Sequence, residues 1–179
     1  MIIIPDAKLQ TTYQEVIATE KLSGRTAKLK LLESIDSLPT FAAITTASVI
    51  PFLDKDKLVA TLLPRGIDIP GGHTESYDKD VACTLIREAK EETGIDLSLP
   101  LYAIGVISWD WCDADPTKTT YMLIATSTVA TLNDYTASYE SLGRQIVSPE
   151  HFLNQYTAGS HAMMTELIKR AQAIVGTIL

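Results

Sequence analysis

The chain has 179 residues, a length typical of one domain and sufficient to bury a core without disulfides or a structural metal. Its 15 Lys and Arg against 22 Asp and Glu leave a net charge of −7. This balance argues against a nucleic-acid polymer as partner, because such a partner needs a basic surface stripe. A small phosphorylated ligand stays possible, since a bound divalent metal reverses the sign of the local field.

The two cysteines and the start of the chain indicate a cellular compartment. Cys83 and Cys112 cannot build a disulfide framework, so we expect free thiols in a reducing environment. Residues 1–5 carry no basic leader and no long apolar run, so we expect neither a signal peptide nor a membrane span. The expectation is a cytoplasmic protein without a membrane partner.

Residues 11–38 predict two short helices separated by Ser23-Gly24 and ending near Pro39. Apolar residues recur there at three- and four-residue steps, namely Tyr13, Val16, Ile17, Leu29, Leu32 and Ile35. We therefore expect residues 1–39 to be a helical extension of a single domain whose core is residues 40–179.

The rest of the chain alternates predicted strands and helices. Residues 41–53 and 58–63 predict two strands joined by a polar turn, and residues 65–72 form a loop rich in Gly and Pro. An apolar stripe from Val81 to Ala89 predicts a helix that stops before Gly94. Strands at 104–111 and 121–132 and a helix at 161–175 follow. This order predicts an α/β fold, a mixed β-sheet covered by helices on both faces.

The predicted central helix carries a cluster of acidic residues. Glu88, Glu91 and Glu92 are spaced at i, i+3 and i+4, so they share one helix face. One interpretation is a solvated acidic surface. Such a surface is poorly stabilised, because close like charges repel and the last turn of a helix disfavours anions. A hard divalent cation such as Mg²⁺ or Mn²⁺ would relieve this arrangement, because it takes clustered oxygen ligands.

Residues 71–95 resemble the signature of the Nudix hydrolases. That signature is a Gly, five residues, a Glu, seven residues, Arg-Glu, an aliphatic or small residue, any residue, Glu-Glu, any residue, Gly and an aliphatic residue. The positions that match it are Arg87, Glu88, Glu91, Glu92, Gly94 and Ile95, preceded by the usual Pro-Gly-Gly at 70–72. The resemblance implies a Nudix-type α/β/α sandwich, here with extra helices at both ends.

One position departs from this signature. Counting from Gly72, its first Glu falls on Asp78, and eight residues rather than seven then separate Asp78 from Arg87. A one-residue insertion before the helix explains this spacing, with Asp78 replacing the Glu that braces the conserved arginine in the family. Alternatively, Asp78 caps free amide groups at the start of the helix.

The resemblance implies hydrolysis of a nucleoside diphosphate derivative by water attack at phosphorus, with Mg²⁺ or Mn²⁺ as cofactor. A pyrophosphate and acidic side chains repel each other, so a metal must bridge them, polarise the phosphoryl oxygen and lower the pKa of water. Carried over to this sequence, Glu88, Glu92 and the Gly71 carbonyl would bind metal, and Glu91 would bind metal or deprotonate water. Arg87 would orient the carboxylates through charge-assisted hydrogen bonds. The catalytic residues are then Arg87, Glu91 and Glu92.

Three further candidates lie outside the signature. Glu140, in a loop after the fourth strand, could supply a second acid or be a plain surface residue. Arg65 could contact a substrate phosphate or be exposed. Trp109 and Trp111 alternate on one strand and point to the same side, so Trp109 could stack on a base or belong to the core.

Two alternatives to a hydrolase stay open. One is a catalytically silent Nudix domain that binds a nucleotide and reports it to a partner. The other is an isopentenyl-diphosphate-isomerase-like enzyme, which would need a catalytic cysteine, and Cys112 is the candidate. We expect a small diphosphate as the ligand, and the added helices could bury a second copy in a homodimer.

Overall fold

The computed structural model describes residues 1–22, 25–111, 119–137 and 141–179. In this part of the chain the strands form one mixed sheet in the order β11-β5-β4-β10-β9-β3-β2. These strands are β2 (Val16–Leu22), β3 (Arg25–Leu31), β4 (Ile44–Asp54), β5 (Lys57–Leu63), β9 (Leu101–Trp111), β10 (Thr120–Leu132) and β11 (Gly143–Val147). Short strands pair at their sides: β1 (Ile2–Ile3), β6 (Gly66–Asp68), β7 (Gly71–His73) and β8 (Ile95–Leu97).

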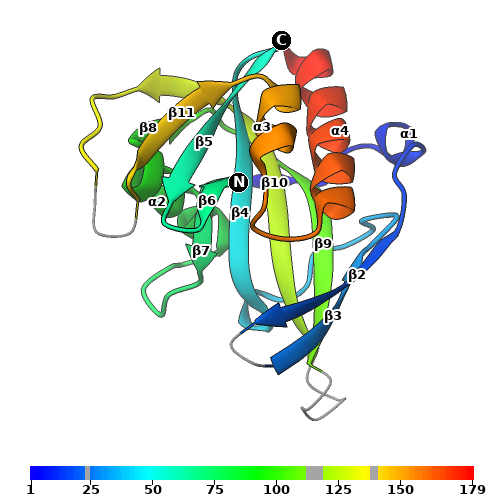
Figure 1. Cartoon of the computed structure of the whole chain (residues 1–179). Coiled ribbons are helices and arrows are strands. Elements are labelled where there is room, and N and C mark those ends of the chain that lie inside the picture. Colours follow the sequence, from blue (N-terminus) through cyan, green and yellow to red (C-terminus); the bar gives the residue numbers. More distant parts are fainter. Residues whose placement is uncertain (23–24, 112–118, 138–140) are drawn as a thin grey trace.

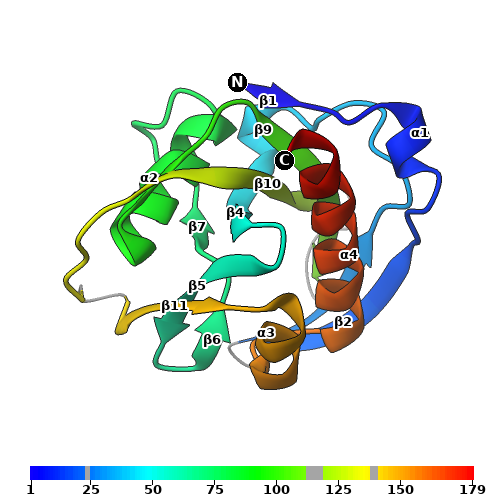
Figure 2. The same ribbon diagram turned by 90° about the horizontal axis from the view of Figure 1, so that it is seen from above.

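Helices cover both faces of this sheet, as the α/β prediction requires. Helix α2 (Val81–Thr93) packs on one face, and α3 (Pro149–Gln155) and α4 (His161–Ile178) pack on the other (Figure 1; Figure 2). The core therefore has two layers, one between α2 and the sheet and one between α3, α4 and the sheet. The short helix α1 (Ala7–Gln10) lies near α4.

The centre of the sheet is the parallel pair of β4 and β10, with Ile124 opposite Ser48. Residues 47–52 of β4 are buried without interruption. Continuous burial is expected of a strand that is covered on both faces. Strand β7 pairs with the start of β4, with Gly71 opposite Ser48. This pairing fixes the glycines of residues 71–72 beside helix α2.

The prediction of helices within residues 11–38 is wrong, because residues 16–31 form the antiparallel hairpin of β2 and β3. Ala27, Leu29 and Leu31 are buried, whereas Lys28 between them is exposed. This alternation has the period of two that is typical of a strand with one buried face. Strand β3 then pairs with β9, which extends the sheet rather than adding a helical layer.

The ends of α2 agree with the sequence prediction. Asp80 caps the first turn by accepting a hydrogen bond from the Cys83 N–H at 2.9 Å. Gly94 ends the helix in the left-handed region at φ 67°, and its N–H donates to the Lys90 carbonyl at 2.9 Å. Glycine adopts this conformation without the steric cost that a Cβ atom brings.

The predicted strands at 41–53, 58–63, 104–111 and 121–132 are found within one to three residues as β4, β5, β9 and β10, and the last helix as α4. Strand β11 and helix α3 were not predicted, although Ser148 and Pro149 give α3 a common start of N-cap and first-turn proline. In the described part of the chain, no helix is long and apolar enough to cross a membrane.

Candidate active site

Helix α2, strand β7 and the following loop enclose a pocket of about 380 Å³. Its lining includes Arg87 and the three acidic residues Glu88, Glu91 and Glu92, so the predicted shared face points into one cavity. Glu88 and Glu92 are only 6% and 5% exposed, whereas the Glu91 side chain is 50% exposed. Two buried carboxylates thus lie beside one that reaches solvent.

The glycines of β7 let the backbone approach these carboxylates. The Gly71 N–H donates to Oε2 of Glu92 at 2.9 Å. A Cβ atom on Gly72 would lie 2.4 Å from Oε1 of Glu88, and one on Gly71 would lie 2.0 Å from Oγ of Ser48. Both distances are too short for any side chain. Gly71 is therefore required by the close approach of β7 to β4, because its Cβ would also lie 2.6 Å from the Ala47 carbonyl, whereas a side chain at Gly72 would displace the end of the Glu88 side chain.

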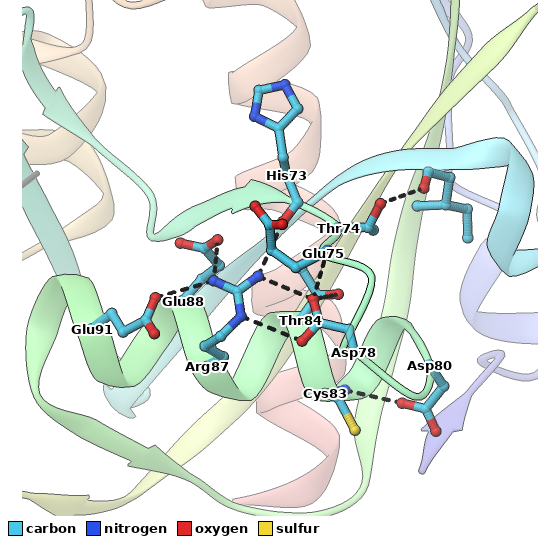
Figure 3. A network of polar contacts seen from close by, with 11 residues as sticks. His73, Thr74, Glu75, Asp78, Asp80, Cys83, Thr84, Arg87, Glu88 and Glu91 are labelled. Atoms are coloured by element: carbon cyan, nitrogen blue, oxygen red, sulfur yellow. Dashed lines mark hydrogen bonds and ion pairs between the residues drawn. The ribbon is translucent and has the colours of Figure 1, made fainter.

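Arg87 is the centre of the polar network in the pocket (Figure 3). Its Nη1 donates to Oε1 of Glu88 at 2.7 Å and to Oε2 of Glu91 at 3.0 Å. Its Nη2 donates to the His73 carbonyl and to Oδ2 of Asp78, both at 3.0 Å, and its Nε donates to Oδ1 of Asp78 at 3.3 Å. A guanidinium has five N–H groups. All five are used. The bonds to the carboxylates raise the pKa of Arg87 above the already high value of a free guanidinium.

Asp78 does reach Arg87, as the insertion hypothesis requires. Its side chain is 3% exposed and also accepts hydrogen bonds from the Thr84 hydroxyl at 2.9 Å and from the Glu75 N–H at 3.0 Å. The bonds from Arg87 and from these two donors lower its pKa to about 2, against the opposing effect of burial. The alternative role, capping the helix, belongs to Asp80.

Glu92 has the opposite electrostatic environment. Its burial raises its pKa to about 7, and the nearby charges of Glu88 and Asp68 raise it further, against the bond from the Gly71 N–H. A carboxyl group in this state holds a proton near neutral pH unless a cation compensates its charge.

Comparison with known proteins shows which fold this is. No family model matches the sequence, and neither does any curated protein. Among solved structures, a pyrophosphohydrolase of Bacillus subtilis aligns over 89% of this chain and 97% of its own, with 21% identity and a TM-score of 0.63. The chain has the Nudix fold.

Two more structures support the assignment of the Nudix fold. A Nudix hydrolase of Nitrosomonas europaea aligns over 73% of this chain and 89% of its own, with 21% identity and a TM-score of 0.56. A Caenorhabditis elegans Ap4A hydrolase, in a binary complex, aligns over 75% and 98%, with 17% identity and a TM-score of 0.55.

The donor set of the pocket fits a hard divalent cation, which the Nudix fold implies. Carboxylates and backbone carbonyls are the ligands that Mg²⁺ takes, and burial of Glu88 and Glu92 leaves negative charge for it to compensate. In the described residues, no three side chains of the His, Cys, Asp and Glu types converge closely enough to hold a metal. Arg87 holds one carboxylate oxygen of Glu88 and one of Glu91 (Figure 3).

The other predicted residues lie in different places. Arg65 lines the pocket with a 62% exposed side chain, and its Nη2 donates to Oδ2 of Asp68 at 2.9 Å. Trp109 is not among the described residues that line the pocket; its ring centre lies 5.6 Å from that of Trp111 with the ring planes tilted by 49°, and it packs against the core layer that contains residues of α4. Glu140 lies outside the described residues, as does Cys112.

Sequence reasoning missed two features of the pocket. Asp68 holds Arg65, and its own pKa is raised by burial. Tyr77 lines the rim of the pocket in the loop before α2. The opposite charges of Arg65 and Asp68, three residues apart around a tight turn, could have indicated the first. An aromatic residue in the inserted loop was a signal for the second.

Proposed function

We propose that this chain is a Mg²⁺-dependent hydrolase that cleaves a phosphoanhydride bond in a nucleoside diphosphate derivative, such as a nucleoside triphosphate, a damaged nucleotide or ADP-ribose. The observation that carries the proposal is the pair of buried carboxylates, Glu88 and Glu92, against the glycine backbone of a pocket in the Nudix fold. Neighbours of the fold include a pyrophosphohydrolase and an Ap4A hydrolase, whose names denote cleavage of this kind of bond.

Each residue of the pocket has a role in this proposal. Glu88, Glu92 and the Gly71 carbonyl would hold the cation, which when bound polarises the phosphoryl oxygen and lowers the pKa of water. Glu91 would accept the proton of the attacking water, because its carboxylate is the one that reaches solvent. Arg87 would keep the carboxylates oriented without touching the substrate, since its five N–H groups are already used.

Arg65 is the cation left to meet the substrate. The pocket lining contains two arginines among the described residues, and Arg87 is fully engaged by acids and a carbonyl. The exposed guanidinium of Arg65, held at one nitrogen by Asp68, keeps donors for a phosphate oxygen.

The test is a hydrolysis screen of the purified chain with ATP, 8-oxo-dGTP, ADP-ribose and Ap4A in the presence of Mg²⁺, with products identified by chromatography. We expect hydrolysis of at least one of them, abolished by EDTA. Glu92→Gln should lower kcat by at least about 100-fold, because loss of even an outer partner of a metal ligand costs about 10- to 100-fold. Glu150→Gln, an exposed change on α3, should leave the rate unchanged.

A silent nucleotide-binding domain is the second candidate, favoured by the lack of three converging acids in the described residues. The same screen separates the two candidates. Nucleotide binding without release of phosphate or nucleotide would replace the hydrolase proposal with this one.

A further inference from the structure

Tyr77 is a large aromatic residue left exposed at the rim of the pocket. Its relative exposure is 68%, and it contributes to the same lining as Arg87 and Glu91. It is the only Phe, Tyr or Trp among the described lining residues. The tryptophan that the sequence offered for a stacking role, Trp109, is half-buried against the core on the other face of the sheet from α2 and does not line this pocket. An aromatic contact in the pocket can therefore come from Tyr77.

The backbone holds Tyr77 in a fixed place. Ser76 and Tyr77 are the middle residues of a turn that the Asp78 N–H closes by donating to the Glu75 carbonyl at 3.0 Å. The Asp78 carboxylate closes it again from the other side, by accepting a hydrogen bond from the Glu75 N–H at 3.0 Å. Because Arg87 fixes the same carboxylate, the turn is tied to α2. The turn thus gives the exposed Tyr77 a defined backbone position beside α2.

The Tyr77 ring lies beside one arginine of the pocket, and a second arginine lines the same pocket. The Arg87 guanidinium lies 5.6 Å from the centre of the Tyr77 ring. Arg65 lines the same pocket from the turn between β5 and β6, and Oδ2 of Asp68 accepts a hydrogen bond from its guanidinium at 2.9 Å. Glu92 follows Arg87 by five positions on α2, which corresponds to about 7.5 Å along the helix axis. A ligand that fills the pocket can therefore contact both the exposed guanidinium of Arg65 and the ring of Tyr77.

We propose that Tyr77 stacks on the base of the bound nucleotide and so selects base-bearing diphosphates over other phosphoanhydrides. The proposal rests on the proposed function for the identity of the ligand. Every base has a π-face, so stacking on one tyrosine favours nucleotides without distinguishing one base from another. The backbone of the turn is already ordered, so stacking restricts only the side-chain rotamers of Tyr77.

The experiment measures binding separately from hydrolysis. Isothermal titration calorimetry in Mg²⁺ compares α,β-methylene-ADP with methylenediphosphonate, which has the same bridging group and no base. We expect Tyr77→Ala to weaken binding of α,β-methylene-ADP by about tenfold or more and to leave binding of methylenediphosphonate within twofold. Tyr77→Phe should bind both ligands as the wild type does, because stacking needs the ring and not the hydroxyl. Ser76→Ala, the neighbouring exposed turn residue, is the matched control and should change neither.

The outcomes distinguish this proposal from the hydrolase proposal. An equal loss for both ligands, no loss for either, or no binding of α,β-methylene-ADP to the wild-type chain overturns the stacking role. A Tyr77-dependent preference for α,β-methylene-ADP supports it, even in a chain that hydrolyses nothing in the screen. Hydrolysis that is unaffected by Tyr77→Ala, with unchanged binding, leaves the enzyme proposal in place and removes Tyr77 from it.

Discussion

The Asp78 carboxylate accepts hydrogen bonds from Nη2 and Nε of Arg87, at 3.0 and 3.3 Å, although it has one methylene fewer than the Glu of the Nudix signature. The turn at residues 75–78 places the Asp78 backbone close enough to the helix for this shorter side chain to reach Arg87. The Thr84 hydroxyl, one turn before Arg87 on α2, also donates to Oδ2 of Asp78 and so helps to fix this carboxylate.

We predict that Asp78→Ala destabilises the protein by about 3–5 kcal/mol, the usual cost of removing one partner of a buried ion pair. Arg87 is 17% exposed and would lose two of its five hydrogen bonds. Asp78→Glu keeps the charge and should be destabilised less. Urea denaturation of the three chains measures this order. A loss below about 1 kcal/mol in Asp78→Ala would show that the turn holds without its acid.

The pH dependence of this effect has a defined sign. The native pKa of Asp78, about 2, lies below its ordinary value of 3.8. A lowered carboxyl pKa stabilises the native state above pH 4, and that stability is lost as the pH falls toward 2. The wild type should therefore lose about 2 kcal/mol over this range through Asp78. The variant Asp78→Ala should lack this component of the acid transition.

Local signals explain which parts of the site could be predicted from the sequence. The acidic face of α2 and its end at Gly94 depend on spacing along one helix, so sequence alone was sufficient. The hairpin of β2 and β3 was missed because two periods fit so short a run. Leu29 and Leu31 are two apart, as in a strand, and Leu29 and Leu32 are three apart, as in a helix. Pairing with β9 decides between them, and that contact is distant in sequence.

Packing between elements explains what could not be predicted. Trp109 and Trp111 do share a side, as the alternation indicated, but which layer that side faces depends on where α4 packs. The contacts of Arg87 with Asp78 and the His73 carbonyl depend on the loop between β7 and α2. A one-residue insertion in that loop changes its geometry in a way that no periodic pattern records.

Glu92 leads to a prediction about stability and Mg²⁺. Its native pKa of about 7 is above its ordinary value of 4.5, so the native state binds the proton more tightly than the unfolded chain. Without Mg²⁺, the free energy of unfolding should fall by about 2–3 kcal/mol through this group as the pH rises from 4.5 to 7. Glu92→Gln should lack this decline and be more stable than the wild type above pH 7.

Mg²⁺ should reverse that order. A ligand that binds only the native state at 100 times its Kd stabilises it by about 2.7 kcal/mol. Chemical denaturation with and without Mg²⁺ should show this gain in the wild type and its loss in Glu92→Gln, with Glu150→Gln as the control. An equal Mg²⁺ effect in all three chains would place the cation elsewhere.

Arg65 should affect substrate binding more than turnover. Its exposed guanidinium is held by Oδ2 of Asp68 at 2.9 Å, and in the proposal it contacts a phosphate oxygen and transfers no proton. Arg65→Ala should raise KM by about tenfold or more with kcat within about threefold, because a charge-assisted hydrogen bond contributes about 1.5–3 kcal/mol. Arg65→Lys keeps the charge without the planar fork and should be intermediate. A fall in kcat at unchanged KM would instead place Arg65 at the reacting phosphorus.

Asp68→Asn separates the orientation of Arg65 from its charge. The variant keeps the guanidinium but loses its charged partner, so KM should rise less than in Arg65→Ala. Steady-state kinetics of both variants and their double mutant measure the coupling. Additive effects of the two changes would show that Asp68 acts independently of Arg65.

The buried pair of Arg170 and Glu166 fastens α4 to the N-terminal segment on the face of the sheet opposite α2. Arg170 is 1% exposed and donates to Oε1 of Glu166 at 2.9 Å, to the Ile104 carbonyl at 3.0 Å and to the Gln14 carbonyl at 2.6 Å. Its guanidinium lies 4.2 Å from the centre of the Tyr13 ring. One side chain thus joins α4, β9 and the segment before β2.

Arg170→Met should therefore destabilise the protein by about 3–5 kcal/mol, because it leaves Glu166 charged, 6% exposed and without its buried cation. The double variant Glu166→Leu, Arg170→Met removes both charges and should regain part of that loss, since apolar residues can replace a buried ion pair. Denaturant midpoints measure both variants. At temperatures where they stay folded, their hydrolysis rates should equal the wild-type rate, because the catalytic pocket lies on the α2 side of the sheet. A fall in kcat in the folded double variant would show that the two faces of the sheet are coupled.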